Sequence, residues 1–260
     1  MPRLLEDAFL KIEWADKHIQ NLNVELNKFM ESHRHTAFIE HDPDGPGDLL
    51  KVRQEYETPS GVSLAMGDVI HNLHSALDIA INRIQFLTHG IMTNYTKFPI
   101  RETKEEFEAA INGGLKGKVP FEILNFLRVD VKPYLGGDGE ALVHLHNLDI
   151  EDKHRIILAA THLAFVNGIR VQLDDGIEAN IGDWLIVPNA VAKECFPGNR
   201  NVKVTEQGRP TFYIEIGKGL PLAGYPVLPT CVNLAEIVGG IVWAMERGMG
   251  VWVKYRDVLT

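Results

Sequence analysis

The sequence has little of what marks secreted, metal-stapled or membrane proteins. It contains two cysteines in 260 residues, and Cys195 and Cys231 have neither metal-ligand spacing nor companions that would build a disulfide framework. We therefore expect free thiols and a cytoplasmic location. No apolar run approaches the roughly 20 residues that cross a bilayer, and charged residues interrupt the apolar positions of the N-terminal segment, unlike a secretory signal. The sequence predicts no membrane partner.

Positive charge is also scarce. Lysine and arginine number 26 against 35 aspartates and glutamates, which leaves a formal net charge of -9. Proteins that wrap a nucleic acid normally carry a basic surface, because contacts to phosphates dominate their affinity. The basic stretches here are short, at 33–35 and 152–155. We expect no extensive nucleic-acid surface, and we keep a small RNA or a protein as the open choices for a partner.

Hydrophobic periodicity predicts an α+β fold. Apolar residues recur at helical spacing in four long segments, about 3–33, 62–89, 140–164 and 233–247. Alternating apolar and polar residues mark strands within about 36–57 and 168–216. A capping box at Thr103 and a proline at position 120 start two short helices. Strands in two blocks separated by helices are typical of segregated layers. We expect one compact domain, 1–260, with a helical bundle of about four main helices and an antiparallel β-sheet layer.

The segment 62–89 combines a broad apolar face with an unusual polar face. We call this face the polar arc; it consists of Asp68, His71, Asn72, His74, Ser75, Asp78 and Asn82. A solvent-facing helix in an acidic protein normally carries lysine and glutamate, which form helices well and solubilise. The polar arc has neither, and its short hydrogen-bonding side chains suit a packed polar interface. A buried seam that only sets helix register would look the same, so a structural and a functional interpretation both stay open.

The segment 140–164 carries charge on its apolar face. On one continuous helix, Asp149, Asp152 and Lys153 lie on that face, whereas Glu151, His154 and Arg155 point away. A buried charge persists only when it is paired. We therefore predict that this helix packs against the polar arc, with Asp152 or Lys153 in hydrogen-bonding range of it. Asp152→Ala should then lower thermal stability sharply and His154→Ala should not. The alternative is a helix break with Asp149 as an N-cap.

Two motifs resemble a known group of proteins. The stretch "GDVIHNLHSALDIAI", a later "LDIEDKHRIIL" and "FPI" between them are similar to a family of uncharacterised bacterial and phage proteins. Its members read close to H-N-L-R-S-A-L-D-H followed by D-K-H-R. The Arg and final His of that pattern have the R-x4-H spacing of HEPN-type helical nucleases. The resemblance implies an Arg and a His that position and activate an RNA 2′-hydroxyl for metal-independent cleavage.

This chain departs from the pattern at both of those positions. His74 stands in place of the Arg and Ile79 in place of the His. An isoleucine cannot transfer a proton, and a histidine lacks the five-donor fork of a guanidinium. The residues that match the family pattern are His71, Asn72, Ser75, Ala76, Leu77, Asp78 and the run 152–155. The usual nuclease mechanism is therefore not expected.

Three functions remain as hypotheses. The first is a binding or interaction module with a degenerate HEPN-like polar centre. The second is an RNase-like enzyme in which His71 or His74 is the general base and Asp78 orients it. The third is a metal-dependent hydrolase built from His71, His74 and Asp78, joined by His144, His146 or Asp152. Candidate binding residues are Asn72, Ser75, Asp152, Lys153, His154 and Arg155.

Further ligands are not predicted. The sequence has no P-loop, no G-x-G-x-x-G motif after a strand and no G-x-S-x-G motif, so we expect no cofactor. We also expect no tightly bound stoichiometric metal. Gly239 and Gly240 interrupt the apolar C-terminal helix, which favours close packing against another helix or a second subunit and is compatible with a homodimer.

Overall fold

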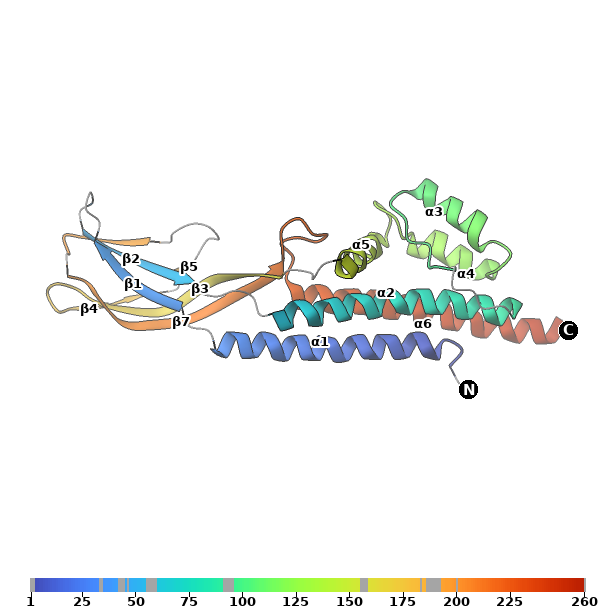
Figure 1. The fold of residues 1–260 in the computed structure, drawn as a ribbon, viewed down its shortest axis with the longest axis horizontal. Helices are drawn as coiled ribbons and strands as arrows, with labels where there is room; N and C mark the ends of the chain where they lie inside the picture. Colours follow the sequence, from blue (N-terminus) through green and yellow to red (C-terminus); the bar gives the residue numbers. More distant parts are fainter. Residues whose placement is uncertain are drawn as a thin grey trace. The chain divides into compact units, whose positions relative to one another are not determined.

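The computed structural model describes residues 3–32, 35–41, 45, 47–54, 60–90, 96–154, 159–182, 184–185, 193–199 and 201–259. Over these residues the fold is α+β, as predicted, with six α-helices and two small antiparallel sheets (Figure 1). From the sequence we expect one compact domain, 1–260, with about four main helices. The contacts divide the chain into two compact units, and each is described by itself. Unit 1 comprises Met1–Asn23, Ser60–Leu158 and Ile216–Thr260, and unit 2 comprises Val24–Pro59 and Ala159–Glu215.

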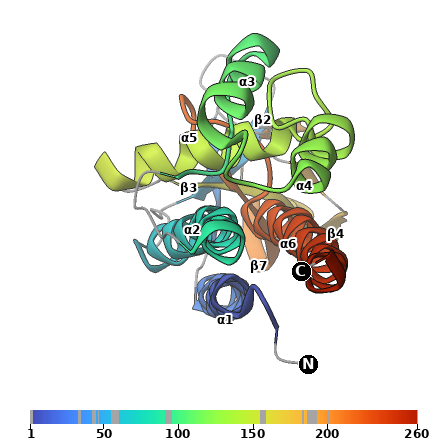
Figure 2. The same ribbon diagram turned by 90° about the vertical axis from the view of Figure 1, so that its right-hand side faces the viewer.

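Unit 1 is a helical bundle. Its helices are α1 (Glu6–Ser32, through Asn23 in this unit), α2 (Ser60–His89), α3 (Lys104–Ala110), α4 (Phe121–Phe126), α5 (Glu140–His154) and α6 (Val227–Leu259). Short π-helical turns, Ile111–Leu115 and Leu127–Val131, continue α3 and α4. Helices α2 and α6 run side by side, and α5, seen almost end-on in Figure 1, lies across them in Figure 2.

Apolar faces of three helices fill the core of unit 1. Helix α2 contributes the largest share, and α5 and α6 pack against it. The fully buried side chains include Val69, Ile70, Leu73, Leu77, Ile81 and Ile84 of α2, Leu142, Leu145 and Leu148 of α5, and Val238, Val242 and Met245 of α6. Burial of such side chains is the main source of stability, because it removes apolar surface from water.

Local signals predict the start and end of several helices correctly. Helix α2 ends at His89, and Gly90 follows with φ +72°, the left-handed conformation that glycine adopts after a helix without steric strain. The Thr103 side chain accepts a hydrogen bond from the Glu106 backbone N at 3.2 Å and caps α3. Pro120 precedes α4 directly. These residues act locally, so the sequence alone places them.

Two predicted helices have wrong boundaries. The helix expected over 140–164 ends at His154, and residues from Ala159 onward form strand β3 (Ala159–Gln172). Apolar residues in 159–166 fit either period, and β-branched and aromatic side chains such as Thr161 and Phe165 favour the strand. The last helix begins at Val227, not at Asn233, and continues to Leu259, beyond the predicted end at 247. Pro229 is tolerated there because the N–H groups of a first helical turn have no intrahelical acceptor.

Helix α6 also corrects the expectation about apolar runs. Within the described residues it contains one stretch, Val227–Val251, that could cross a membrane by length and composition, with a mean hydropathy of 1.6. The core helix of a soluble protein passes the same test, and 44% of this stretch is buried in the fold. The observation is therefore weak evidence for a membrane, and the cytoplasmic location stays a prediction.

Unit 2 holds the strands. One sheet has the order β1 (His35–His41), β2 (Gly47–Gln54) and β6 (Lys193–Pro197). The other has β4 (Glu178–Ile181), β3 and β5 (Trp184–Leu185), with β7 (Lys203–Ile216) also paired to β3. The predicted early hairpin is present: β1 and β2 pair antiparallel from His35 opposite Gln54 to His41 opposite Asp48. Most of the predicted turn between them lies outside the described residues. The core of this unit consists of Phe29, Ala37, Leu50, Val166, Ile169, Val171 and Val202.

A side chain joins two strands of unit 2 that belong to different sheets. The Ala37 backbone N donates to Gln207 Oε1 at 2.6 Å, and Gln207 Nε2 donates to the Ala37 backbone O at 3.1 Å. The amide of Gln207 on β7 thus pairs with β1 in the way that a neighbouring strand would.

Candidate functional site

The polar arc of α2 is partly covered, as the sequence predicts. On the side of α1, Lys11 Nζ donates to Asn72 Oδ1 at 3.0 Å, and Asn72 is buried. His18 Nδ1 lies 3.3 Å from the Asp68 carboxylate. These contacts account for one edge of the polar arc as packing between helices. Asn72, a candidate binding residue, therefore contacts α1.

On the side of α5, one buried carboxylate gathers three donors. Asp149 has a side chain that is 1% exposed. Its Oδ1 lies 3.0 Å from His71 Nδ1, and its Oδ2 lies 3.3 Å from His74 Nδ1 and 2.5 Å from Lys153 Nζ. An ionised carboxylate only accepts hydrogen bonds, so His71 carries a proton on Nδ1. We call these four residues together with His146 the Asp149 centre.

A second histidine extends the Asp149 centre. His74 Nε2 lies 2.9 Å from His146 Nδ1, and the two rings stack at 28°. In this contact one ring nitrogen carries the proton and donates, and the other accepts. Burial lowers the pKa of both His74 and His146 below the ordinary value of 6.5; the nearby Asp149 carboxylate opposes this shift but does not cancel it. Both rings are therefore held neutral.

Asp78 and Asn82 bind the segment that follows α2. Asp78 Oδ1 accepts from the Phe98 backbone N at 2.9 Å, and Oδ2 binds Lys97 Nζ at 2.8 Å. Asn82 Nδ2 donates to the Thr96 backbone O at 2.6 Å. These two residues thus bind the segment that contains the "FPI" motif against α2. The residue that orients His71 is Asp149, and His74 is bound by His146. This corrects the role predicted for Asp78.

The charged residues of α5 contact other groups than the sequence predicts. Helices α2 and α5 do pack against each other, and the helix is continuous through Asp149, so the N-cap alternative is wrong. The hydrogen bonds to the polar arc come from Asp149, whereas Lys153 binds Asp149 on its own helix. Asp152 instead lies against Gly67: a Cβ at that glycine would be 2.3 Å from Asp152 Oδ1. Burial, then the Asp149 and Asp68 carboxylates, raise the pKa of Asp152.

The contact between Gly67 and Asp152 gives a test by double-mutant cycle. Gly67→Ala should stabilise the protein by less than the helix-propensity difference between glycine and alanine, because the new Cβ displaces the Asp152 carboxylate from its place against α2. In an Asp152→Ala background the same substitution should stabilise by about 1 kcal/mol, the helix-propensity difference between glycine and alanine. Thermal unfolding of the four proteins measures the coupling. Equal effects of Gly67→Ala in both backgrounds would show that the contact does not matter.

The remaining candidate residues do not join the Asp149 centre. Ser75 is half-buried, His154 is exposed, and Arg155 lies outside the described residues. His144 pairs with Glu140 of its own helix at 3.7 Å. Ile79 lines a hollow of about 550 Å³ with Leu10 and Trp14 of α1.

The metal hypothesis finds little support in the donor geometry. In the part of the chain that the structure describes, no group of three or more histidine, cysteine, aspartate or glutamate side chains is arranged to hold a metal ion.

Comparison with known proteins adds no relative: no family model, no curated protein and no solved structure matches the chain.

Sequence reasoning missed the central role of Asp149. Its available signal was an acidic residue within an apolar helix face, four residues before Lys153, but that signal fitted an N-cap equally well. A basic group formed by Lys97, Arg101 and Lys118 was also missed. These three residues are dispersed in the sequence, so no spacing marks them.

Proposed function

We propose that this chain is a binding module with a degenerate HEPN-like centre, and that it binds RNA without cleaving it. The observation that carries the proposal is the buried Asp149 carboxylate, which holds two half-exposed donors on one surface. The side chains of His71 and Lys153 are 48% and 51% exposed, and both bind Asp149. With His71 Nδ1 bound to Asp149, its Nε2 and the Lys153 ammonium are the groups left for a ligand.

The position of Ile79 supports binding without cleavage. In the resembled pattern this position holds the catalytic histidine, whereas Ile79 here lines the hollow beside α1. It can neither supply nor accept a proton. His74, at the position of the arginine, binds Asp149 and His146 and is mostly buried. Neither residue offers the groups that the metal-independent mechanism requires.

A second candidate function rests on a specific contact. Asp149 binds His71 Nδ1, and among the described residues His71 Nε2 has no hydrogen-bond partner. This is the arrangement of a carboxylate-supported general base. If such a base acts on RNA, the chain is an RNase-like enzyme with His71 as the catalytic residue. The two candidates differ in one outcome, the integrity of bound RNA.

Binding and cleavage can be measured in one experiment. A fluorescein-labelled single-stranded RNA of mixed sequence is titrated with the protein in EDTA, and the same samples are run on a denaturing gel. We expect saturable binding and intact RNA. Lys153→Ala should weaken binding about tenfold, because a hydrogen bond to a charged group is worth about 1.5–3 kcal/mol. His71→Ala should weaken it about fivefold, because Nε2 only accepts and a neutral hydrogen bond is worth about 1 kcal/mol. His144→Ala is the matched control, because His144 lies on α5 with Lys153 but pairs with Glu140.

Each contrary result has a separate meaning. Cleavage in EDTA that disappears in His71→Ala would replace the proposal with the RNase-like function. Binding that is lost equally in His144→Ala would remove the Asp149 centre from the interaction. RNA that does not bind at all would refute both RNA-directed functions.

A further inference from the structure

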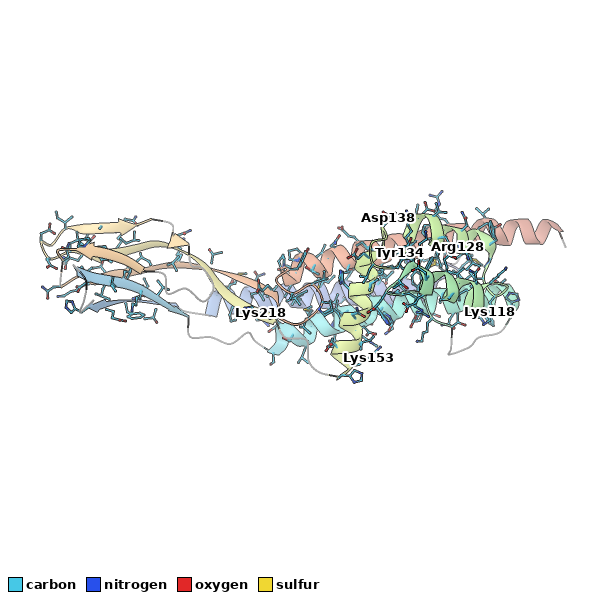
Figure 3. The ribbon with its side chains drawn as sticks, turned by 90° about the horizontal axis from the view of Figure 1, so that it is seen from above. Lys118, Arg128, Tyr134, Asp138, Lys153 and Lys218 are labelled. Atoms are coloured by element: carbon cyan, nitrogen blue, oxygen red, sulfur yellow. The ribbon has the colours of Figure 1, made fainter. Side chains whose placement is uncertain are left out.

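A second polar site lies in unit 1, away from the Asp149 centre. It is a pocket of about 220 Å³ between the segment after α2 and the end of α3. We call it the basic pocket; its lining is Thr96, Lys97, Pro99, Arg101, Ala110, Gly114, Leu115 and Lys118. Figure 3 shows Lys118 on the side of α3 and α4, well separated from Lys153 of α5.

The lining of the basic pocket is positively charged, whereas the whole chain is negatively charged. Three of the lining residues are cationic and none is acidic, although the chain has a net charge of -9. Lys97 is already paired with Asp78, so the charges of Arg101 and Lys118 are the ones that would attract an anion to the cavity. The charge of Arg101 also extends to His146, whose pKa it helps to lower.

The three cations retain donors for a ligand. Lys97 is held by Asp78 at 2.8 Å, and an ammonium has three N–H groups, so two remain. Arg101 Nη1 donates to the Ile100 backbone O at 2.6 Å, which leaves most of its five N–H donors. Among the described residues, no carboxylate lies within ion-pair distance of the Lys118 ammonium.

The size and charge of the basic pocket select a class of ligand. A cavity of about 220 Å³ is below the range of about 300–1,000 Å³ that holds a drug-sized molecule, so it suits one compact group. Phosphate carries close to two negative charges near neutral pH and presents three strong acceptor oxygens, which matches three cationic donors. We propose that the basic pocket binds a phosphate group, either as inorganic phosphate or as a phosphate monoester. The inference rests on the residues of this pocket and is independent of RNA binding at the Asp149 centre.

Two pairs of variants test the proposal on the full chain. Lys118→Ala removes one donor from the pocket, and Lys116→Ala removes an exposed lysine that does not line it. Gly114→Leu fills the pocket without changing charge, because open space surrounds the position of its Cβ; Gly113→Leu places the same side chain outside the lining. Both glycines have ordinary negative φ, so a side chain is tolerated.

Equilibrium dialysis with radiolabelled inorganic phosphate at constant ionic strength gives the readout. We expect one saturable site, weakened about five- to tenfold in Lys118→Ala and in Gly114→Leu, as for loss of one charge-assisted hydrogen bond. Affinity should be unchanged in Lys116→Ala, Gly113→Leu and His71→Ala. Competition by glycerol phosphate identifies an esterified phosphate as the ligand, and failure to compete identifies free phosphate; both outcomes support the site. No saturable binding, or equal loss in the control variants, would overturn the proposal.

Discussion

Asp149→Ala should lower the free energy of unfolding by about 1–3 kcal/mol, the usual result of leaving polar groups without their buried partner. The side chain is 1% exposed, accepts from His71 and Lys153, and lies 3.3 Å from His74. Its loss leaves His71 Nδ1 without its acceptor and the Lys153 ammonium without its counter-charge. At roughly 2–4 °C per kcal/mol for a chain of this size, the melting temperature should fall by about 2–12 °C. Thermal unfolding followed by circular dichroism measures it.

The control for this prediction is the neighbouring acidic residue. Asp152 is only partly buried, and the Asp149 and Asp68 carboxylates oppose its charge, so Asp152→Ala should cost little. This reverses the expectation from sequence, which assigned the large effect to Asp152. The exposed His154 supplies a second control, His154→Ala. If Asp152→Ala lowered the melting temperature as much as Asp149→Ala, the buried carboxylate would not be the organising group.

Acidification should destabilise the fold through the two stacked histidines. His74 and His146 have a lowered pKa in the folded protein because burial disfavours the charged ring. In the unfolded chain the pKa returns to about 6.5. The unfolded state therefore binds protons at a higher pH than the folded state does, and acid favours unfolding.

The direction and range follow from this difference. The stability that the neutral rings provide is fully present above about pH 6.5 and is lost as the pH falls from there through the lowered folded-state pKa. For the mostly buried His74 the loss is at most about 1.4 kcal/mol for each pH unit in that range. The charged groups that act on these rings are Asp149, Asp78, Lys153 and Arg101. Asp152 has the opposite effect on stability at more acidic pH. Its pKa is raised in the folded protein, so the folded state binds this proton more readily than the unfolded state does and gains stability as the pH falls.

Urea unfolding between about pH 8 and about pH 5, the range in which an ordinary histidine titrates, measures the effect. We expect the free energy of unfolding to fall with pH in the wild type. His74→Gln and His146→Asn should reduce the dependence, whereas His144→Asn, a partly exposed histidine of the same helix, should leave it intact. A wild-type stability that does not change over this range would contradict the assignment.

The fold was predictable wherever the signal was local. Thr103 and Gly90 mark helix ends through their own backbone and side-chain chemistry, so α2 and α3 were placed closely. The error at 159–164 has a physical cause, because a short apolar stretch satisfies the helical and the strand period equally. Strand pairing in unit 2 decides the outcome there, and that pairing joins residues far apart in the chain.

For the candidate site, the sequence predicts only which face of each helix carries the polar residues. Helical phase placed His71 and His74 on a polar arc and Asp149 on the opposing helix face. The partner of each group depends on how the helices cross: His71 binds a carboxylate 78 residues later, and His74 binds a ring 72 residues later. Helical phase gives the direction of a side chain but not which turn of the neighbouring helix it meets. For this reason the sequence favours Asp152 or Lys153 as the partner of the polar arc, whereas the structure shows Asp149.

The side chain of Gln207 has a consequence for association between molecules. Among the described residues, strand β1 pairs within its sheet with β2 alone, so its other side carries backbone groups that could template the addition of a foreign strand. At Ala37 both of these groups are bound by the Gln207 amide. An incoming strand would have to displace two hydrogen bonds before it could align with β1. The amide therefore protects the middle of this edge against intermolecular β-pairing without a proline, a bulge or a charged side chain at that position.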